Sequence, residues 1–488
     1  MYEPVIGLEI HAQLLTQTKL FCGCLTRFGD LPNTHTCSVC LGLPGALPVL
    51  NSEAVAHAIK LALAIKAKIN LKSFFSRKNY FYPDLPKGYQ ITQYKEPIAY
   101  DGYLEIESNG TRKKIGIERI NLEEDAGKSI HEGYPDSENK TYLDFNRSGI
   151  PLLEIVGKPE ISSPQEAADF LSLLRTILQY LEICDGNMEE GSLRCDANLS
   201  IRKKGKKELG VKTEIKNINS FRFLQKALQY EFERQIRLLE SGKKVTQETR
   251  YWDASQNKTV AMRTKEEAHD YRYFPEPDLP PLIISSEWIE KIKSSFPELP
   301  QEKITRFVEQ YKIPYKDAKI LTSEKNLANY FEKTVEYTKS PKLTSNWILS
   351  EVLRYLKQMN IEITQFAVKP EDLAELILLI EKNQISGKMA KEILPEMINT
   401  RKKANLIIKE KGLFQITDEE TLEKIARKVI LANPKPLEQY KQGKTKIFGF
   451  FVGQVMKETE GKANPQSVNK ILNQILKEII SKNNQKSL

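Results

Sequence analysis

The sequence has no apolar run long enough to cross a membrane. Its purely aliphatic stretches, such as 376–380, are far shorter than the roughly 20 residues that a transmembrane helix needs. The first nine residues include two glutamates and no base, whereas a secretory signal peptide begins with basic residues before an apolar segment. We therefore expect a cytoplasmic protein without a membrane partner.

Cysteine and histidine are scarce, with 6 and 5 copies in 488 residues. Four of the cysteines are Cys22, Cys24, Cys37 and Cys40, and the other two lie more than a hundred residues further on. The two closely spaced pairs have the spacing of a tetrahedral thiolate site, not of a secreted disulfide framework. Because four thiolates leave no open coordination position, we predict a structural zinc ion.

The sequence also lacks the glycine-rich loops that commonly bind nucleotide phosphates. Neither 127–129 (GKS) nor 443–445 (GKT) has the upstream glycine of a P-loop, and no G-x-G-x-x-G occurs. No serine or cysteine nucleophile motif is present, so an amidase site is not expected on this chain. Any ATP site must be built from strands, acids and a metal ion.

Positive charge is concentrated near the C-terminus. The net charge is +9, and residues 441–488 carry nine Lys and three Glu, a net of +6. This pattern is typical of a module that binds a polyanion such as RNA. A lysine-rich, solvated helical surface explains the charge equally well.

The hydrophobic pattern changes along the chain and predicts an α+β fold followed by helices. Up to about residue 290, short alternating runs predict strands at 5–14, 117–125, 192–202 and 212–218, with helices at 164–181 and 221–239. There is no regular strand–helix–strand rhythm, so the sheet is expected to be antiparallel. After a Pro-rich linker at 294–300, amphipathic helices follow at 303–311, 344–359 and 371–382, and Asn464 and Pro465 begin a last one. We predict domains at 1–292, 293–405 and 406–488.

The first predicted strand carries a candidate site for a divalent cation. Alternation places Glu9, His11 and Gln13 on one face and the apolar Leu8 and Ile10 on the other. Carboxylates and an imidazole can hold a divalent ion that also takes phosphate oxygens. The consecutive acids at 123–125 add to this interpretation, although alone they would indicate a solvated acidic turn.

Basic and aromatic residues accompany these acids. The segment 76–90 (SRKNYFYPDLPKGYQ) combines cations with aromatic rings, which suits a nucleotide or an RNA end. An ordinary Pro-rich surface loop is the alternative for this segment. Arg147, Arg194, Lys216 and Arg222 add cations that could contact phosphoryl groups.

Several long segments together resemble one enzyme family, the B subunits of the bacterial glutamyl/aspartyl-tRNA amidotransferases. They are VIGLEIHAQL, FCGC…CSVCLGLPGALPVLN, RKNYFYPDLPKGYQITQY, EEDAGKS, DFNRSGIPLLEIV, GSLRCDANLSIR, EIKNINSFR, AHDYRYFPEPDLPPL and GFFVGQVMKETEGKANPQ. They run in order from residue 5 to residue 466, so the resemblance covers nearly the whole chain.

The resemblance implies a glutamine-synthetase-like antiparallel cradle, an all-α helical domain and a small three-helix tail. It implies that ATP and Mg²⁺ activate the side-chain carboxylate of Glu or Asp on misacylated tRNA as an acyl phosphate. Ammonia, supplied by an amidase A subunit, then gives Gln-tRNA(Gln) or Asn-tRNA(Asn). A small C subunit completes a heterotrimer, and a glutamyl- or aspartyl-tRNA synthetase is a possible further partner.

The matched segments and the strand faces together select the site residues. For Mg²⁺ and catalysis they indicate Glu9, His11 and Glu124, with Glu123, Glu190 and Asp196 as further ligands. For nucleotide and phosphoryl contacts they indicate Lys78, Lys87, Arg147 and Arg194. For the tRNA backbone they indicate Lys441, Lys444, Lys446, Lys457 and Lys462.

Two other classes of function stay open. One is a noncatalytic tRNA-binding scaffold, against which the clustered acids argue. The other is a ligase that joins an amine to a small carboxylic acid, against which the basic tail and the aromatic segments argue.

Overall fold

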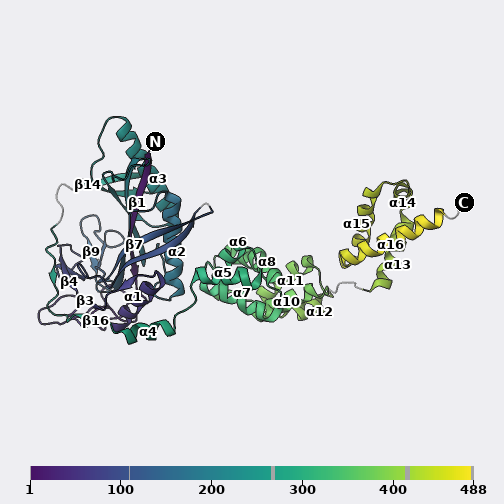
Figure 1. Cartoon of the computed structure of the whole chain (residues 1–488). Coiled ribbons are helices and arrows are strands. Elements are labelled where there is room, and N and C mark those ends of the chain that lie inside the picture. The colour runs from purple at the N-terminus through teal and green to yellow at the C-terminus, as the bar shows by residue number, and fades with distance from the viewer. Residues whose placement is uncertain (1, 109, 265–269, 413–417, 485–488) are drawn as a thin grey trace. The chain divides into compact units, whose positions relative to one another are not determined.

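The computed structural model describes residues 2–108, 110–264, 270–412 and 418–484 (Figure 1). Ala268 and His269, which open the segment AHDYRYFPEPDLPPL, lie outside the described residues, as do 413–417 and 485–488 of the predicted tail. The chain divides into two compact units, Met1–Pro300 and Gln301–Leu488.

A nine-stranded sheet forms the centre of the first unit. Its order is β14-β13-β12-β11-β1-β10-β7-β6-β2, and all neighbours are antiparallel except β12 and β13, which are parallel. The bounds are β1 Tyr2–Gln13, β2 Lys68–Ile69, β6 Ala99–Ser108, β7 Thr111–Glu124, β10 Pro151–Gly157, β11 Leu193–Lys203, β12 Thr213–Ile218, β13 Glu248–Asp253 and β14 Lys258–Thr264.

Alternation along the central strands gives the sheet one apolar and one polar face. Leu8, Ile10 and Ala12 of β1 are almost fully buried in the main hydrophobic core, while Glu9 and His11 between them point to the other face. Because side chains alternate with a period of two, each apolar residue in the core fixes the direction of its polar neighbour.

Helices cover the apolar face. They are α1 Ser52–Ala64, α2 Pro164–Tyr180 and α3 Phe221–Glu240, with α4 Ser286–Ser294 packed against α1. Figure 1 shows α2 and α3 alongside the long strands. The side chains of Asn51, Ser163 and Ser220 accept hydrogen bonds from the first-turn amides and so fix where these helices begin.

Three small sheets lie beside the large one. β4 (Ser76–Asn79) pairs with β5 (Tyr89–Thr92) and β15 (Phe274–Pro275). β3 (Lys72–Ser73) pairs with β16 (Leu282–Ile283), and β8 (Lys128–Ile130) pairs with β9 (Tyr142–Asp144). The basic and aromatic segment 76–90 is thus held as a β-hairpin.

The described part of the second unit contains helices and no strand, and it has two hydrophobic cores. One core joins α5 Pro300–Tyr311, α6 Tyr315–Leu321, α7 Lys325–Thr338, α8 Pro341–Trp347, α9 Leu353–Met359, α10 Pro370–Glu381, α11 Gly387–Thr400 and α12 Ala404–Lys411. The other joins α13 Glu419–Ala432, α15 Phe448–Glu458 and α16 Pro465–Asn484, with α14 Pro434–Lys441 at its edge.

The secondary structure matches the sequence pattern closely. The predicted helices occur within three residues of their expected bounds, and the one expected at 344–359 runs through a π-helical turn at Ile348–Val352. Asn464 caps α16 by accepting the amides of Gln466 and Ser467. β7 begins at Thr111 instead of 117, because its exposed basic end, TRKK, pairs with β6 without an alternating pattern.

The mixed α+β fold is therefore confirmed, while the glutamine-synthetase likeness and the domain boundaries stay predictions. In the tail, α14 is additional to the three expected helices. It contributes no fully buried residue, and its Leu437 and Tyr440 only border the tail core. No described helix is long and apolar enough to span a membrane.

One buried histidine leads to a prediction about acid stability. His57 of α1 is only 6% exposed, and its Nδ1 has no hydrogen-bond partner among the described residues. Burial, assisted by the charge of Lys60, lowers its pKa to about 4. The unfolded chain protonates this histidine below about pH 6.5, so folding loses about 2 kcal/mol at pH 5 through this group.

We expect His57→Leu to remove this loss. The variant should be stabilised relative to the wild type more strongly at pH 5 than at pH 7.5, measured by thermal unfolding at both values. His131→Leu replaces an exposed histidine and is the matched control. The same stability difference at both pH values would show that His57 is not held neutral.

Candidate functional site

The polar face of the large sheet brings together ionisable residues from neighbouring strands. In the β-sheet register, His11 lies opposite Glu154 of β10 and Arg194 of β11, and Glu9 lies opposite Asp196. The predicted side-by-side placement of Glu9 and His11 is therefore extended by residues that lie more than a hundred positions away in the sequence.

Three of these residues could hold a metal ion. A ligand atom from each of Glu9, His11 and Glu154 lies within 4.8 Å of the others. The Nε2 atom of His11 is 4.0 Å from the Oε1 atom of Glu9 and 3.5 Å from the Oε1 atom of Glu123. Carboxylate oxygens with one imidazole suit a hard divalent cation whose remaining ligands are water or phosphate.

Hydrogen bonds hold the acids in place. The Nδ2 atom of Asn121 donates to Glu154 at 2.6 Å, and the hydroxyl of Thr92 donates to Glu123 at 2.8 Å. The buried Oδ1 atom of Asn121 and the buried Nε of Arg194 have no hydrogen-bond partner among the described residues. Asn121 also lines the cavity described below, whereas Arg194 does not.

The acids repel one another in a buried environment. Burial, followed by the charges of Glu154 and Asp196, raises the pKa of Glu9 to about 7. Burial and Glu154 likewise raise the pKa of Glu123 to about 8. Burial lowers the pKa of His11, which favours the neutral imidazole that a metal requires. A cation bound among these acids would therefore offset their mutual repulsion.

Basic residues surround the cluster without neutralising it. Lys216 donates to Asp196 at 2.6 Å. Burial opposes the charge of Lys78, but the nearby Glu123 and Glu154 carboxylates outweigh this effect and raise its pKa. Its ammonium lies 4.9 Å from the centre of the Tyr271 ring.

Asp125 organises a second group beside the cluster. Although burial opposes its charge, Arg194 and Arg147 keep its pKa below the usual range. The Oδ2 atom of Asp125 lies 2.9 Å from a guanidinium nitrogen of Arg194 and 3.6 Å from one of Arg147. It also accepts a hydrogen bond from Gln13 at 2.9 Å. Arg147 and Arg194 are thus both held at one carboxylate.

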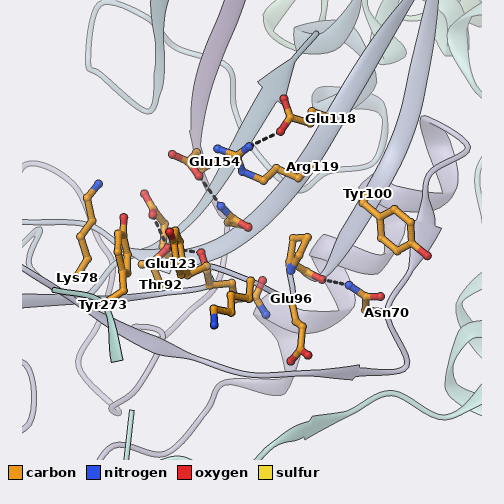
Figure 2. Close-up of a pocket in the computed structure, with 15 residues that line it drawn as sticks. Asn70, Lys78, Thr92, Glu96, Tyr100, Glu118, Arg119, Glu123, Glu154 and Tyr273 are labelled. Atoms are coloured by element: carbon orange, nitrogen blue, oxygen red, sulfur yellow. Dashed lines mark hydrogen bonds and ion pairs between the residues drawn. The ribbon is translucent and has the colours of Figure 1, made fainter. Parts of the chain in front are cut away.

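A cavity of about 630 Å³ opens from this face. Figure 2 shows Lys78, Tyr273, Glu123 and Glu154 toward one end, and Asn70 and Tyr100 at the other. The rings of Tyr94 and Tyr273, both in its wall, stack with their centres 4.1 Å apart. The volume is within the range of small-molecule sites.

Two predicted metal ligands lie elsewhere. Adjacent strand residues point to opposite faces, so the carboxylate of Glu124 is separated from that of Glu123. It is buried against the Lys87 ammonium and accepts the amide of Ile91. Glu190 lies on an exposed turn before β11. The structure therefore brings neither Glu124 nor Glu190 to the Glu9–His11 cluster. Lys87, a predicted phosphoryl contact, is paired with Glu124.

Sequence reasoning missed Glu154, Asn121, Tyr94 and Tyr273. Glu154 is the single charged residue in PLLEIVG, an otherwise apolar strand, and this isolation could have singled it out. The contribution of Tyr94 and Tyr273 depends on loops that meet only in the folded chain, so no local signal indicated it.

The four clustered cysteines converge as predicted. Their sulfur atoms all lie within 4.8 Å of one another, and those of Cys37 and Cys40 are 3.9 Å apart. Tetrahedral Zn–S bonds of about 2.3 Å imply sulfur atoms about 3.8 Å apart. The cluster could therefore bind a metal ion of this kind with little adjustment.

The predicted tRNA-binding lysines differ in their surroundings. Lys441 and Lys462 pair with Glu438 and Glu460. Lys444, Lys446 and Lys457 are exposed and form no ion pair with any residue that the structure describes. These three are the ones available to a polyanion.

In a comparison with known proteins, both parts of the chain match protein families. The GatB/GatE catalytic domain family matches residues 4–290, and the GatB domain family matches residues 329–476. The chain is 56% identical over 477 residues to the B subunit of the aspartyl/glutamyl-tRNA(Asn/Gln) amidotransferase of Thermodesulfovibrio yellowstonii, covering 98% of this chain and 100% of that protein.

Other bacterial relatives agree. The protein of the same name from Carboxydothermus hydrogenoformans is 55% identical, with 96% of this chain and 98% of the relative covered. The protein of this name from Persephonella marina is 52% identical, with 98% of this chain and 100% of the relative covered. With both family matches and this coverage, the chain belongs to the family of aspartyl/glutamyl-tRNA(Asn/Gln) amidotransferase B subunits.

Proposed function

We propose that the site on the polar sheet face amidates Glu or Asp attached to tRNA in two steps. A side-chain carboxylate oxygen attacks the γ-phosphorus of ATP, ADP leaves, and an acyl phosphate forms. Ammonia then attacks the carbonyl carbon, loses a proton and expels inorganic phosphate, which gives Gln-tRNA(Gln) or Asn-tRNA(Asn). The observation that carries this proposal is the Glu9–His11–Glu154 cluster beside a cavity lined by Lys78.

Glu9, His11 and Glu154 would hold Mg²⁺, with Glu123 and Asp196 as neighbouring acids. When bound, the ion would offset the negative charge of the phosphate oxygens. Glu124 and Glu190 take no part in this proposal, because their carboxylates lie apart from the cluster.

Cations contact the transferred phosphoryl group. Lys78 lines the cavity, and Arg194 lies opposite His11 in the strand register, which supports the same role for that residue. Arg147 shares Asp125 with Arg194 and so lies close to it. Positioned cations stabilise the charge that develops on the phosphoryl oxygens. Lys87 is a weaker candidate, since Glu124 already neutralises it.

The stacked Tyr94–Tyr273 pair supports nucleoside binding in the cavity. An aromatic face stacks with a base irrespective of base identity. Lys95, which also lines the cavity, adds positive charge for phosphates, whereas Arg119 is paired with Glu118.

The partners of this chain follow from the reaction. Ammonia must come from another chain, so we infer an amidase A subunit, together with a small C subunit in a heterotrimer. Misacylated tRNA is the substrate, and a glutamyl- or aspartyl-tRNA synthetase could deliver it. This chemistry belongs to protein synthesis in the cytoplasm.

The four-cysteine cluster is proposed to hold one structural zinc ion. A closed shell of four thiolates leaves no position for substrate, so the ion would organise the loops at 20–41 and not the reaction.

Removing the metal ligands should abolish the chemistry without affecting RNA binding. We expect His11→Ala and Glu154→Gln to lower tRNA-stimulated phosphate release from ATP by about 10²-fold or more, with unchanged tRNA affinity. The assay uses the complex with the amidase partner and compares Glu-tRNA(Gln) with Gln-tRNA(Gln).

Glu105→Gln, an exposed acid on β6, is the control for this experiment. Unaffected turnover in both site variants would favour the scaffold function. Turnover in the wild type without any tRNA would favour a ligase acting on a small molecule.

The zinc proposal predicts a bound metal in the purified protein. Metal analysis should find about one zinc per chain, as a four-thiolate site binds a single ion. Cys37→Ser should lose it, whereas Cys184→Ser, at a buried cysteine outside the cluster, should retain it. Zinc at equal content in both variants would rule out the cluster as the site.

The tail lysines should contribute to tRNA affinity through phosphate contacts. Replacing Lys444, Lys446 and Lys457 by Ala should weaken binding and reduce the slope of log K against log salt by about 3, one per lost contact. The control is the triple Ala variant of Lys424, Lys428 and Lys470, each of which is paired with a glutamate. If both triple variants changed the tRNA affinity and its salt dependence equally, Lys444, Lys446 and Lys457 would not form a specific tRNA-binding surface.

A further inference from the structure

Lys19 is a fully buried lysine at the cysteine cluster. Its exposed fraction is 0%, and its ammonium donates to the carbonyl oxygens of His35 at 2.7 Å and Phe145 at 3.2 Å. The third contact is the sulfur atom of Cys40 at 3.6 Å. A lysine is seldom buried to this degree unless it is paired.

The charge of Lys19 requires a partner. A buried ammonium without an anion is strongly disfavoured, and no described carboxylate lies within ion-pairing distance of the Lys19 ammonium. The two carbonyl groups are neutral. Among the described contacts, Cys40 is therefore the one that can carry a negative charge, and it would do so as the thiolate that metal binding requires.

The same side chain packs against the loop 145–149. Gly149 has a φ of +88°, and a Cβ at this position would lie 3.4 Å from both the Cβ of Cys40 and the Cδ of Lys19. The amide of Leu20 donates to the Gly149 carbonyl at 2.9 Å. The hydroxyl of Ser148 donates to the Cys40 carbonyl at 3.3 Å. The cysteine cluster and this loop are thus bonded at several points.

The other side of the loop meets the candidate active site. The amide of Gly149 donates to the Asp125 carbonyl at 2.8 Å, and Arg147 donates to the Ala126 carbonyl at 3.0 Å. Arg147 and Asp125 are the residues that, with Arg194, border the acid cluster. Residues 145–149 therefore join the cysteine cluster to the site on the sheet.

We propose that Lys19 is a positioning residue with two linked roles. Its ammonium neutralises part of the excess negative charge of four metal-bound thiolates, and it fastens the 145–149 loop that carries Arg147 to the metal centre. The proposal rests on the proposed zinc site. It predicts that the metal stabilises the active-site loop through Lys19.

The test measures zinc affinity by competition with a chromogenic chelator, using the full chain. Partners outside the first coordination shell typically change metal affinity by 10–100-fold. We expect a loss of about this size in Lys19→Met and Lys19→Gln. Gln keeps a hydrogen-bond donor but not the charge. Lys19→Arg, which keeps the charge, should retain more of the affinity.

Lys60→Met, at a half-buried lysine of α1, is the matched control. A second readout is the thiolate-to-metal charge-transfer band of the cobalt-substituted protein, which should shift in Lys19→Gln and not in the control. Zinc affinity equal to the wild type in both Lys19→Met and Lys19→Gln would overturn the electrostatic role.

Hydrogen exchange of the wild type tests the coupling without any substitution. Removing the metal should accelerate exchange of the Leu20 and Gly149 amides, and Lys19→Met with saturating zinc should show part of the same acceleration. Unchanged exchange on metal removal would overturn the coupling. If the wild type bound neither zinc nor cobalt, the zinc proposal would fall first and the role of Lys19 with it.

Discussion

The antiparallel pairing of β1 with β10 and β11 is the constraint on which the rest of the site depends. It places His11 between Glu154 and Arg194, and Glu9 beside Asp196. The apolar residues between them are held in the core under α1–α3, so a shift of one residue would bury the acids and expose Leu8 and Ile10. Core packing thus supplies the energy that keeps mutually repelling carboxylates together.

That repulsion explains the chemistry available to the site. Glu9 and Glu123 have raised pKa values because partial or full burial and the other acids nearby disfavour their charged forms. Lys78 and Lys216 offset part of this charge, and the remainder suits a divalent cation. Asp125 has the opposite surroundings, with two arginines that keep it ionised. The site therefore combines acids that could hold a divalent cation with basic side chains that could contact an anion such as a phosphate.

The cysteine cluster and the sheet face are connected by structure and not by shared ligands. Lys19, Ser148 and Gly149 link Cys40 to the loop of Arg147, and Gly149 links that loop to Asp125. A metal ion held by the four cysteines, as proposed, would act on the sheet face through the position of this loop.

The sequence by itself determined the α+β class, the helices, the faces of β1 and β11 and the convergence of four cysteines, because these follow from local periodicity and short spacing. It also identified the family. Only the tertiary structure decided that Glu154 joins Glu9 and His11, and that Glu124 pairs with Lys87 instead. These outcomes depend on strand order and on which loops cover the sheet, and contacts between residues so distant along the chain leave no periodic trace in it.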